Sequence, residues 1–240
     1  MILNSLSIGG APHLQFYNVT RLARQSLVLF LVGALPAVLG TASARAGACD
    51  RQTVSTTPSA EQMGTAILIN EVRDNPYGER HVGSVCWRLD RITAAGQADK
   101  LVVHADVDIP DFEMRMAMDF DHNGDRSTSA SHFVTITFEQ PPELVREVIT
   151  VPGIMLKHSE KTAGTPFAAL GTKIAKGSFL VSLSGHEADL KRNLQLLKER
   201  SWFDIPLVYA NQRRAVLAVE KGYRGDQIFR EAMAEWERTR

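Results

Sequence analysis

The sequence predicts a mostly β fold, an antiparallel β-sandwich-like domain with one inserted and one C-terminal helix. Between residues 65 and 183, short segments alternate apolar and polar side chains, and turn-forming residues separate them. Apolar residues then recur at helical spacing over 184–200 and again after Gly225. The apolar content of 44% in 240 residues suits a globular chain with one core.

Each expected strand is a short apolar or alternating segment next to residues that favour turns. Asp74–Gly78 (DNPYG) supplies the turn of a first hairpin. Pro141 and Pro142 interrupt a later strand, because proline cannot donate to a strand ladder. The expected strands are 66–72, 81–89, 101–109, 112–120, 132–138, 148–156 and 178–183, followed by a hairpin over 205–219 that turns near Asn211-Gln212.

Two helices are expected in the last quarter of the chain. Ser184 and Glu187 have the spacing of a capping box, and leucines follow at helical intervals to about Arg200. A final helix opens at Gly225-Asp226 and places on one face Ile228, Phe229, Ala232, Met233 and Trp236. Because no internal repeat is visible, we predict a single β-rich domain over 63–240.

The first 46 residues have the layout of a secretory signal. They contain three arginines and no acidic residue, and Arg21 and Arg24 precede an apolar run, Ser26–Leu39. This run has 14 residues, whereas a helix that spans a bilayer needs roughly 20. An uncleaved anchor is the alternative to a cleaved signal.

Small residues at Ala44 and Ala46 predict cleavage after Ala46. The expected organisation is therefore a signal peptide over 1–46, a flexible polar leader over 47–62 and the β-rich domain. We expect a periplasmic or secreted mature chain without a transmembrane span.

Two cysteines, Cys49 and Cys86, remain after the expected cleavage. In an oxidising compartment they could form a disulfide around a loop of about 37 residues, which would stabilise the fold by roughly 3–4 kcal/mol. One alternative is lipidation of Cys49, since Ala46–Cys49 is weakly similar to a lipobox; another is two unrelated thiols. The disulfide is the favoured prediction.

The segment 113–125 (EMRMAMDFDHNGD) combines two patterns found in metal sites. Its aspartates match the first half of an EF-hand loop, but Ala130 stands where that loop needs a bidentate glutamate. Its methionines could bind Cu(I), yet they share a face with Phe112 and Phe120, as core residues do. We favour a core strand and a hairpin turn, and we interpret the polar side chains of 104–108 (HADVD) as the solvated side of another strand. The alternative, a periplasmic copper or calcium protein, would use the 104–132 region, where the potential ligands are dense. Its candidate ligands are Met114, Met116, Met118, Asp119, Asp121, Asn123 and Asp125.

No catalytic motif is recognisable in the sequence. Gly-x-Ser-x-Gly, a P-loop, a Rossmann glycine pattern, His-Glu-x-x-His and Cys-x-x-Cys are all absent. Ser182, Ser184 and His186 lie at an expected strand-to-helix turn without the hydrolase pattern. We therefore expect no catalytic residues and no cofactor, with a hydrolase as an alternative. The net charge of zero gives no indication of a nucleic-acid partner.

Basic residues suggest a surface for an unknown envelope or protein partner. The expected surface combines the edge at Arg213 and Arg214, beside Tyr209, with Lys191 and Arg192 on the inserted helix. The alternative interpretation is an ordinary solvated face.

The block Asn193–Trp236 (NLQLLKERSWFDIPLVYANQRRAVLAVEKGYRGDQIFREAMAEW) resembles the ending of a group of uncharacterised exported proteins from rhizobia and related alphaproteobacteria. SHFVTITF (131–138) and VPGIMLK (151–157) resemble the middle of the same group. The layout is also similar to the invasion-associated locus B family, secreted β-sandwich proteins tied to host-cell invasion or envelope stress, although the paired downstream cysteines of that family are absent. The first resemblance supplies no catalytic residues. From the signal layout and the absence of catalytic motifs, we predict a secreted, non-catalytic envelope protein that acts by binding or structural support.

Overall fold

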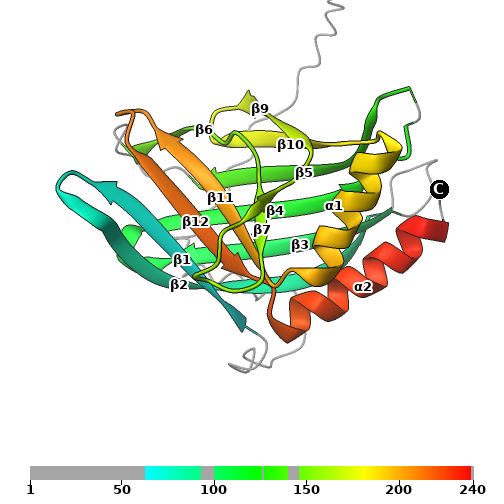
Figure 1. Ribbon diagram of the computed structural model, residues 1–240, viewed down its shortest axis with the longest axis horizontal. Helices are drawn as coiled ribbons and strands as arrows, with labels where there is room; N and C mark the ends of the chain where they lie inside the picture. The colour runs from blue at the N-terminus through cyan, green and yellow to red at the C-terminus, as the bar shows by residue number, and fades with distance from the viewer. Residues whose placement is uncertain (1–62, 93–99, 126, 140–145, 239–240) are drawn as a thin grey trace, which may run out of the picture. The chain divides into compact units, whose positions relative to one another are not determined.

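The computed structural model describes residues 63–92, 100–125, 127–139 and 146–238, which belong to one compact unit (Figure 1). They form a mostly antiparallel β structure with two α-helices, which confirms the predicted fold class. The predicted signal, leader and Cys49 lie outside these residues, so the cleavage site and the Cys49–Cys86 disulfide stay predictions.

One sheet of twelve strands makes up most of the described part of the chain. Its strands are β1 (Met63–Val72), β2 (Asn75–Ile92), β3 (Lys100–Ile109), β4 (Met114–His122), β5 (Ala130–Glu139), β6 (Val148–Thr150), β7 (Met155–Lys157), β8 (Thr165–Pro166), β9 (Ala169–Ala175), β10 (Ser178–Ser184), β11 (Trp202–Tyr209) and β12 (Arg214–Glu220). The two helices are α1 (Glu187–Glu199) and α2 (Gly222–Arg238). Neither of these helices is long and apolar enough to cross a membrane.

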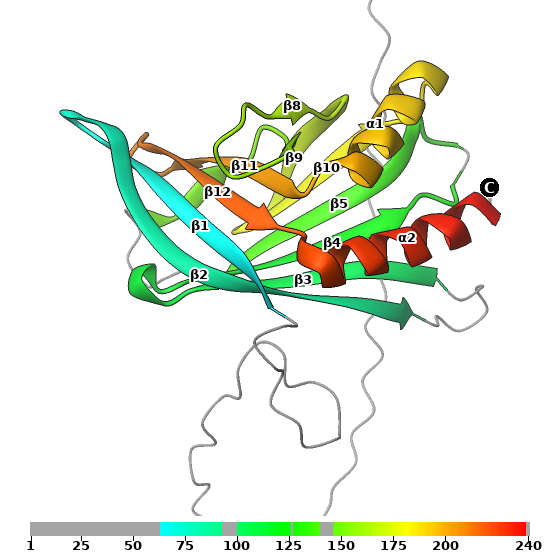
Figure 2. The ribbon, with the colours of Figure 1, turned by 60° about the horizontal axis from the view of Figure 1, so that its bottom comes forward.

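The sheet is built around a meander from β1 to β5. Its order is β8-β7-β11-β12-β1-β2-β3-β4-β5-β10-β9, and β6 pairs with β11. The sheet is strongly coiled (Figure 2), and β11 and β12 pass across β3 and β4 in the view of Figure 1. The expected sandwich therefore takes the form of one sheet whose two halves face each other.

A group of aromatic side chains joins the two halves of the sheet to α2. Phe120 on β4 lies 5.4 Å from Phe203 on β11 and 5.0 Å from Phe229 on α2, measured between ring centroids. Trp87 on β2 lies 5.4 Å from Phe229. Each such pair contributes roughly 0.5–1.5 kcal/mol beyond the burial of its surface, so α2 is part of the core.

Lys221 is a buried cation between the two helices, with only 1% of its surface exposed. Its Nζ donates to the carbonyl oxygens of Leu197 at 2.7 Å and Arg200 at 2.8 Å. These groups belong to the C-terminal end of α1, where carbonyls lack partners within the helix. The same Nζ lies 2.8 Å from Asp226 Oδ1 on α2. Burial lowers the pKa of Lys221, and the contact with Asp226 opposes that shift.

The alternating segments predicted at 101–109, 132–138 and 178–183 are confirmed as β3, β5 and β10. The segment 148–156 is not one strand: it forms β6 and β7, separated around Pro152, which has no N–H to donate. Strand β9 was not predicted, because five of its seven residues are exposed and leave no alternating pattern.

The predicted capping box at the start of α1 is wrong, although the helix itself is confirmed. His186 is the N-cap residue and makes no capping bond through its side chain. The hydroxyl of Ser184 donates to Asp189 Oδ2 at 2.7 Å and accepts from the His186 N–H at 3.3 Å. Helix α2 begins at Gly222, three residues before the predicted start.

Replacing Lys221 with methionine should lower the free energy of unfolding by about 2–4 kcal/mol, because two buried carbonyls and Asp226 lose their partner. Urea unfolding followed by circular dichroism measures this change. Lys191→Met, at an exposed position on α1, is the control and should change stability by less than about 0.5 kcal/mol. Equal stability of the two variants would show that Lys221 does not link the helices.

Candidate functional site

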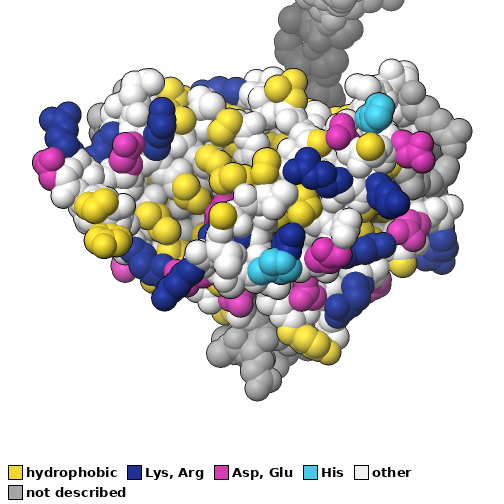
Figure 3. All heavy atoms as spheres, viewed as in Figure 1, with side chains coloured by type: hydrophobic (Ala, Val, Ile, Leu, Met, Phe, Trp, Pro, Cys, Tyr) yellow, Lys and Arg dark blue, Asp and Glu magenta, His cyan; other side chains and the backbone are white. Residues whose placement is uncertain are grey.

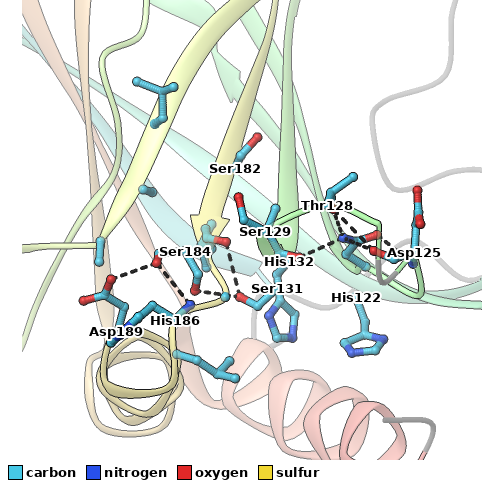
Figure 4. A pocket seen from close by; sticks show the side chains of 18 of the residues that line it. His122, Asp125, Thr128, Ser129, Ser131, His132, Ser182, Ser184, His186 and Asp189 are labelled. Atoms are coloured by element: carbon cyan, nitrogen blue, oxygen red, sulfur yellow. Dashed lines mark hydrogen bonds between the residues drawn. The ribbon is translucent and has the colours of Figure 1, made fainter.

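An open cleft lies where the turn between β4 and β5, strands β9 and β10, and the first turn of α1 meet (Figure 4). Its volume is about 910 Å³. Hydroxyl and imidazole groups dominate its polar lining. They belong to Thr128, Ser129, Ser131, Ser182 and Ser184 and to His122, His132 and His186.

Two of these histidines continue the inward-facing rows of β4 and β5. His122 follows Phe120 at the next inward position of β4, and His132 precedes Val134 at the equivalent position of β5. The two histidines stand directly opposite each other in the antiparallel register, with ring centroids 5.2 Å apart. His132 is 4% exposed, and its ring lies 5.1 Å from that of Trp236 on α2. The histidines therefore mark the point where the core meets the cleft.

The turn between β4 and β5 is shaped by Asn123. Its Nδ2 donates to the carbonyls of Asp125 at 3.1 Å and Ala130 at 2.7 Å, and its Oδ1 accepts from the Asp125 N–H at 3.0 Å. Asp125 Oδ1 accepts a hydrogen bond from the Ser127 N–H at 2.8 Å. Hydrogen bonds with the backbone and side chain of Ser127 lower the pKa of the Asp125 carboxyl. The side chains of Asn123 and Asp125 therefore hold this turn in shape by bonding to its backbone.

Further hydrogen bonds tie the start of α1 to that turn. Ser131 Oγ donates to the Ser184 carbonyl at 3.1 Å, and the Gly185 N–H donates to the Ser129 carbonyl at 2.7 Å. As described above, the Ser184 hydroxyl donates to Asp189. Figure 4 shows Ser184 and Asp189 joined in this way at the base of the cleft. The hydroxyl of Ser184 is thus directed at a carboxylate, not at an imidazole that could act as its base.

Asn193 on α1 holds Ala168, a residue that lines the cleft. Asn193 is 1% exposed, and its Nδ2 donates to the Ala168 carbonyl at 3.1 Å while its Oδ1 accepts from the Ala168 N–H at 2.9 Å. The side-chain amide of Asn193 therefore makes the two hydrogen bonds to the Ala168 backbone that a neighbouring strand would otherwise make. This paired contact fixes α1 against the segment that enters β9.

The residues of the metal-binding alternative lie on two faces of β4 and, for Asn123 and Asp125, in the turn that follows it. The side chains of Met114, Met116 and Met118 are at most 5% exposed and belong to the hydrophobic core. Asp119 and Asp121 alternate with them and point away from the core. Within the described ranges, no group of three or more His, Cys, Asp or Glu side chains is placed to hold a metal ion. The methionine thioethers and the aspartate carboxylates of β4 thus lie on opposite faces of the strand.

A row of ion pairs covers the outer face of β2, β3 and β4. His104 Nε2 lies 3.0 Å from Asp106 Oδ1, and its Nδ1 contacts Asp119 Oδ1. Arg88 also pairs with Asp106, and Lys100 pairs with Asp121. Burial alone would lower the pKa of His104, but hydrogen bonds to the two aspartates and their negative charges raise it to about 9. The face predicted to be solvated is partly exposed, and its side chains form an ion-pair network around His104.

The predicted basic surface is not assembled. Tyr209 is corrected from a contact residue to a core residue: it is 4% exposed, and its hydroxyl donates to Asn70 Oδ1 at 2.9 Å. Arg213 and Arg214 are exposed at the tip of the β11–β12 hairpin, whereas Lys191 and Arg192 lie on α1, at the other end of the sheet in both ribbon views (Figures 1 and 2). Over α1 and α2, positive and negative side chains are interspersed (Figure 3).

Comparisons with protein-family models, curated proteins and solved structures found no match to the chain. The resemblances to exported proteins therefore stay predictions from the sequence. The sequence interpretation also missed the pairing of His122 with His132. A usable signal was present, because the two histidines flank a predicted hairpin turn and fall on the inward-facing positions of both strands.

The raised pKa of His104 predicts a dependence of stability on pH. A group whose pKa rises on folding, here from 6.5 to about 9, contributes stability below the lower value and loses it as the pH rises through the higher one. The free energy of unfolding should fall by about 1–2 kcal/mol over this window, after allowance for solvent screening.

Urea unfolding at pH 6 and pH 9.5 measures this fall, which His104→Gln should abolish. His158→Gln, which changes an exposed histidine, should retain it. A fall that persists unchanged in His104→Gln would assign the pH dependence to other groups.

Proposed function

We propose that the protein is an exported, non-catalytic binding protein of the cell envelope and that its cleft holds a small polar ligand. The observation that carries this proposal is the cleft itself, with a volume of about 910 Å³ and a polar lining fixed by hydrogen bonds. Ligand sites in proteins are usually preformed concavities of roughly 300–1,000 Å³ with a few placed polar groups.

The lining favours a ligand that can both donate and accept hydrogen bonds. Serine and threonine hydroxyls do both, and a neutral imidazole offers one donor and one acceptor. Leu170 and Leu190 add apolar surface at the walls. A small molecule with several hydroxyl, amide or carboxyl groups and an apolar edge matches this combination.

The arrangement of Ser184 supports binding in preference to hydrolysis. A nucleophilic serine needs a base within hydrogen-bond reach, and the Ser184 hydroxyl instead donates to Asp189 at 2.7 Å. His186 is exposed and provides the N-cap backbone of α1. These contacts hold the helix start in place, which is a structural role.

The proposed location rests on the basic, acid-free N-terminal region and the short apolar run that follows it. Intact-mass measurement on protein isolated from the envelope of its native cells tests this part. A mass that corresponds to residues 47–240 less two hydrogens would support both cleavage and the disulfide. A full-length mass would overturn export by signal cleavage.

Filling the cleft should block ligand binding. Ser182 is a half-buried residue of β10 that lines the cleft, so Ser182→Trp should weaken binding at least about tenfold by placing an indole in the ligand's space. A thermal-shift screen of sugars, amino acids and dicarboxylates identifies the ligand, and calorimetry measures its affinity.

Ser178→Trp is the matched control. Ser178 lies on the same strand and is also half-buried, but it does not line the cleft. Circular dichroism should show that both variants are folded. Equal affinity of the two variants for the ligand would place the binding site elsewhere.

A further inference from the structure

We propose that His122 and His132, which both line the cleft, form a binding site for a divalent transition-metal ion. Imidazole nitrogen is a preferred ligand of Zn²⁺, Cu²⁺ and Ni²⁺. Both histidines lie within the 104–132 region of the metal-binding alternative predicted from the sequence, but neither is among the ligands named there.

The spacing of the two rings matches that of two ligands on one ion. Zinc–nitrogen bonds are about 2.0–2.1 Å long, so two imidazoles that share a tetrahedral ion have ring centres about 5 Å apart. The ring centroids of His122 and His132 are 5.2 Å apart. Figure 4 shows the two rings side by side on the same side of the β4–β5 pair.

The backbone beneath the pair is rigid, which reduces the cost of organising the site. The histidines occupy paired positions at the end of the β4–β5 ladder, and the Asn123 N–H donates to the Ser131 carbonyl at 3.0 Å just beyond them. Trp236 packs against His132, and its Nε1 donates to the Leu101 carbonyl at 3.1 Å. Ligands held by packing and outer hydrogen bonds bind metals more tightly than mobile ones.

The surrounding charges suit a cation. Trp236 belongs to the last turn of α2, and the C-terminal end of a helix carries partial negative charge. The basic residue of that turn, Arg238, is paired with Glu235. Asp125 and Asp189 line the same cleft.

Two histidines leave a tetrahedral or octahedral ion incompletely coordinated. Since the described residues contain no group of three or more His, Cys, Asp or Glu placed around a metal, water or a ligand in the cleft would supply the other donors. This step extends the proposed function, because a carboxylate or hydroxyl of the cleft ligand could reach the ion. The metal site itself does not depend on that ligand.

Calorimetric titration of the purified mature chain with Zn²⁺, Ni²⁺ and Cu²⁺, without any organic ligand, tests the proposal. We expect one ion per chain at this site, and His122→Gln and His132→Gln should each weaken binding at least about tenfold, as loss of one of two protein ligands requires. His186→Gln, which changes a histidine in the same cleft outside the pair, should bind like the wild type. Affinity should also fall below about pH 6, where imidazoles bind protons.

A spectroscopic measurement keeps the test valid if a variant folds poorly. Electron paramagnetic resonance of the Cu²⁺-loaded wild-type chain should show hyperfine coupling to two imidazole nitrogens. Absence of metal binding, unchanged affinity in both single variants, or a larger loss in His186→Gln would overturn the proposal. A chain that binds its organic ligand but no metal would refute this inference and leave the proposed function intact.

Discussion

The contact between Phe120, Phe203 and Phe229 is the interaction on which the rest of the structure depends. It joins a central strand, a strand of the opposite half of the sheet and the last helix, which lie far apart in the sequence. A twisted sheet of this length would stay open unless its two halves buried a shared apolar surface. Because α2 packs on the same rings, the position of Trp236, and with it the environment of His132, follows from this contact.

The aromatic contact sets where the helices lie, but polar contacts determine their orientation. Buried polar groups are stable only when they are hydrogen-bonded, so each one allows few arrangements of its neighbours. Lys221 fixes the end of α1 relative to the start of α2. Asn193 fixes α1 relative to the segment before β9. The start of α1 is held independently, through Ser184 and Asp189. Helix α1 is therefore fixed along its length, and the cleft is a rigid feature.

The strands that can be predicted from the sequence are those with one face in the core and the other face outside it. In β3, β4 and β5 the core lies on one side only, so burial imposes a period of two that can be read directly from the sequence. Strand β9 lies at the end of the sheet and is largely exposed, so its residues carry no such pattern. The cleft is unpredictable for another reason, because 122–125, 128–132, 168–170 and 182–186 meet only through the pairing of β5 with β10 and the docking of α1.

Alternation also explains why the methionines of the metal-like pattern in β4 belong to a core strand, as favoured from the sequence, and where a better candidate lies. Methionines and aspartates occupy opposite parities of the strand, so their side chains point to opposite faces and cannot share an ion. His122 has the same parity as Met118 and Phe120, and therefore continues the inward row to the edge of the core. The same row on β5 continues to His132, which packs against Trp236 and also lines the cleft. The inward positions of β4 and β5 thus belong to the core at Phe120 and Val134, and the next inward positions, His122 and His132, line the cleft.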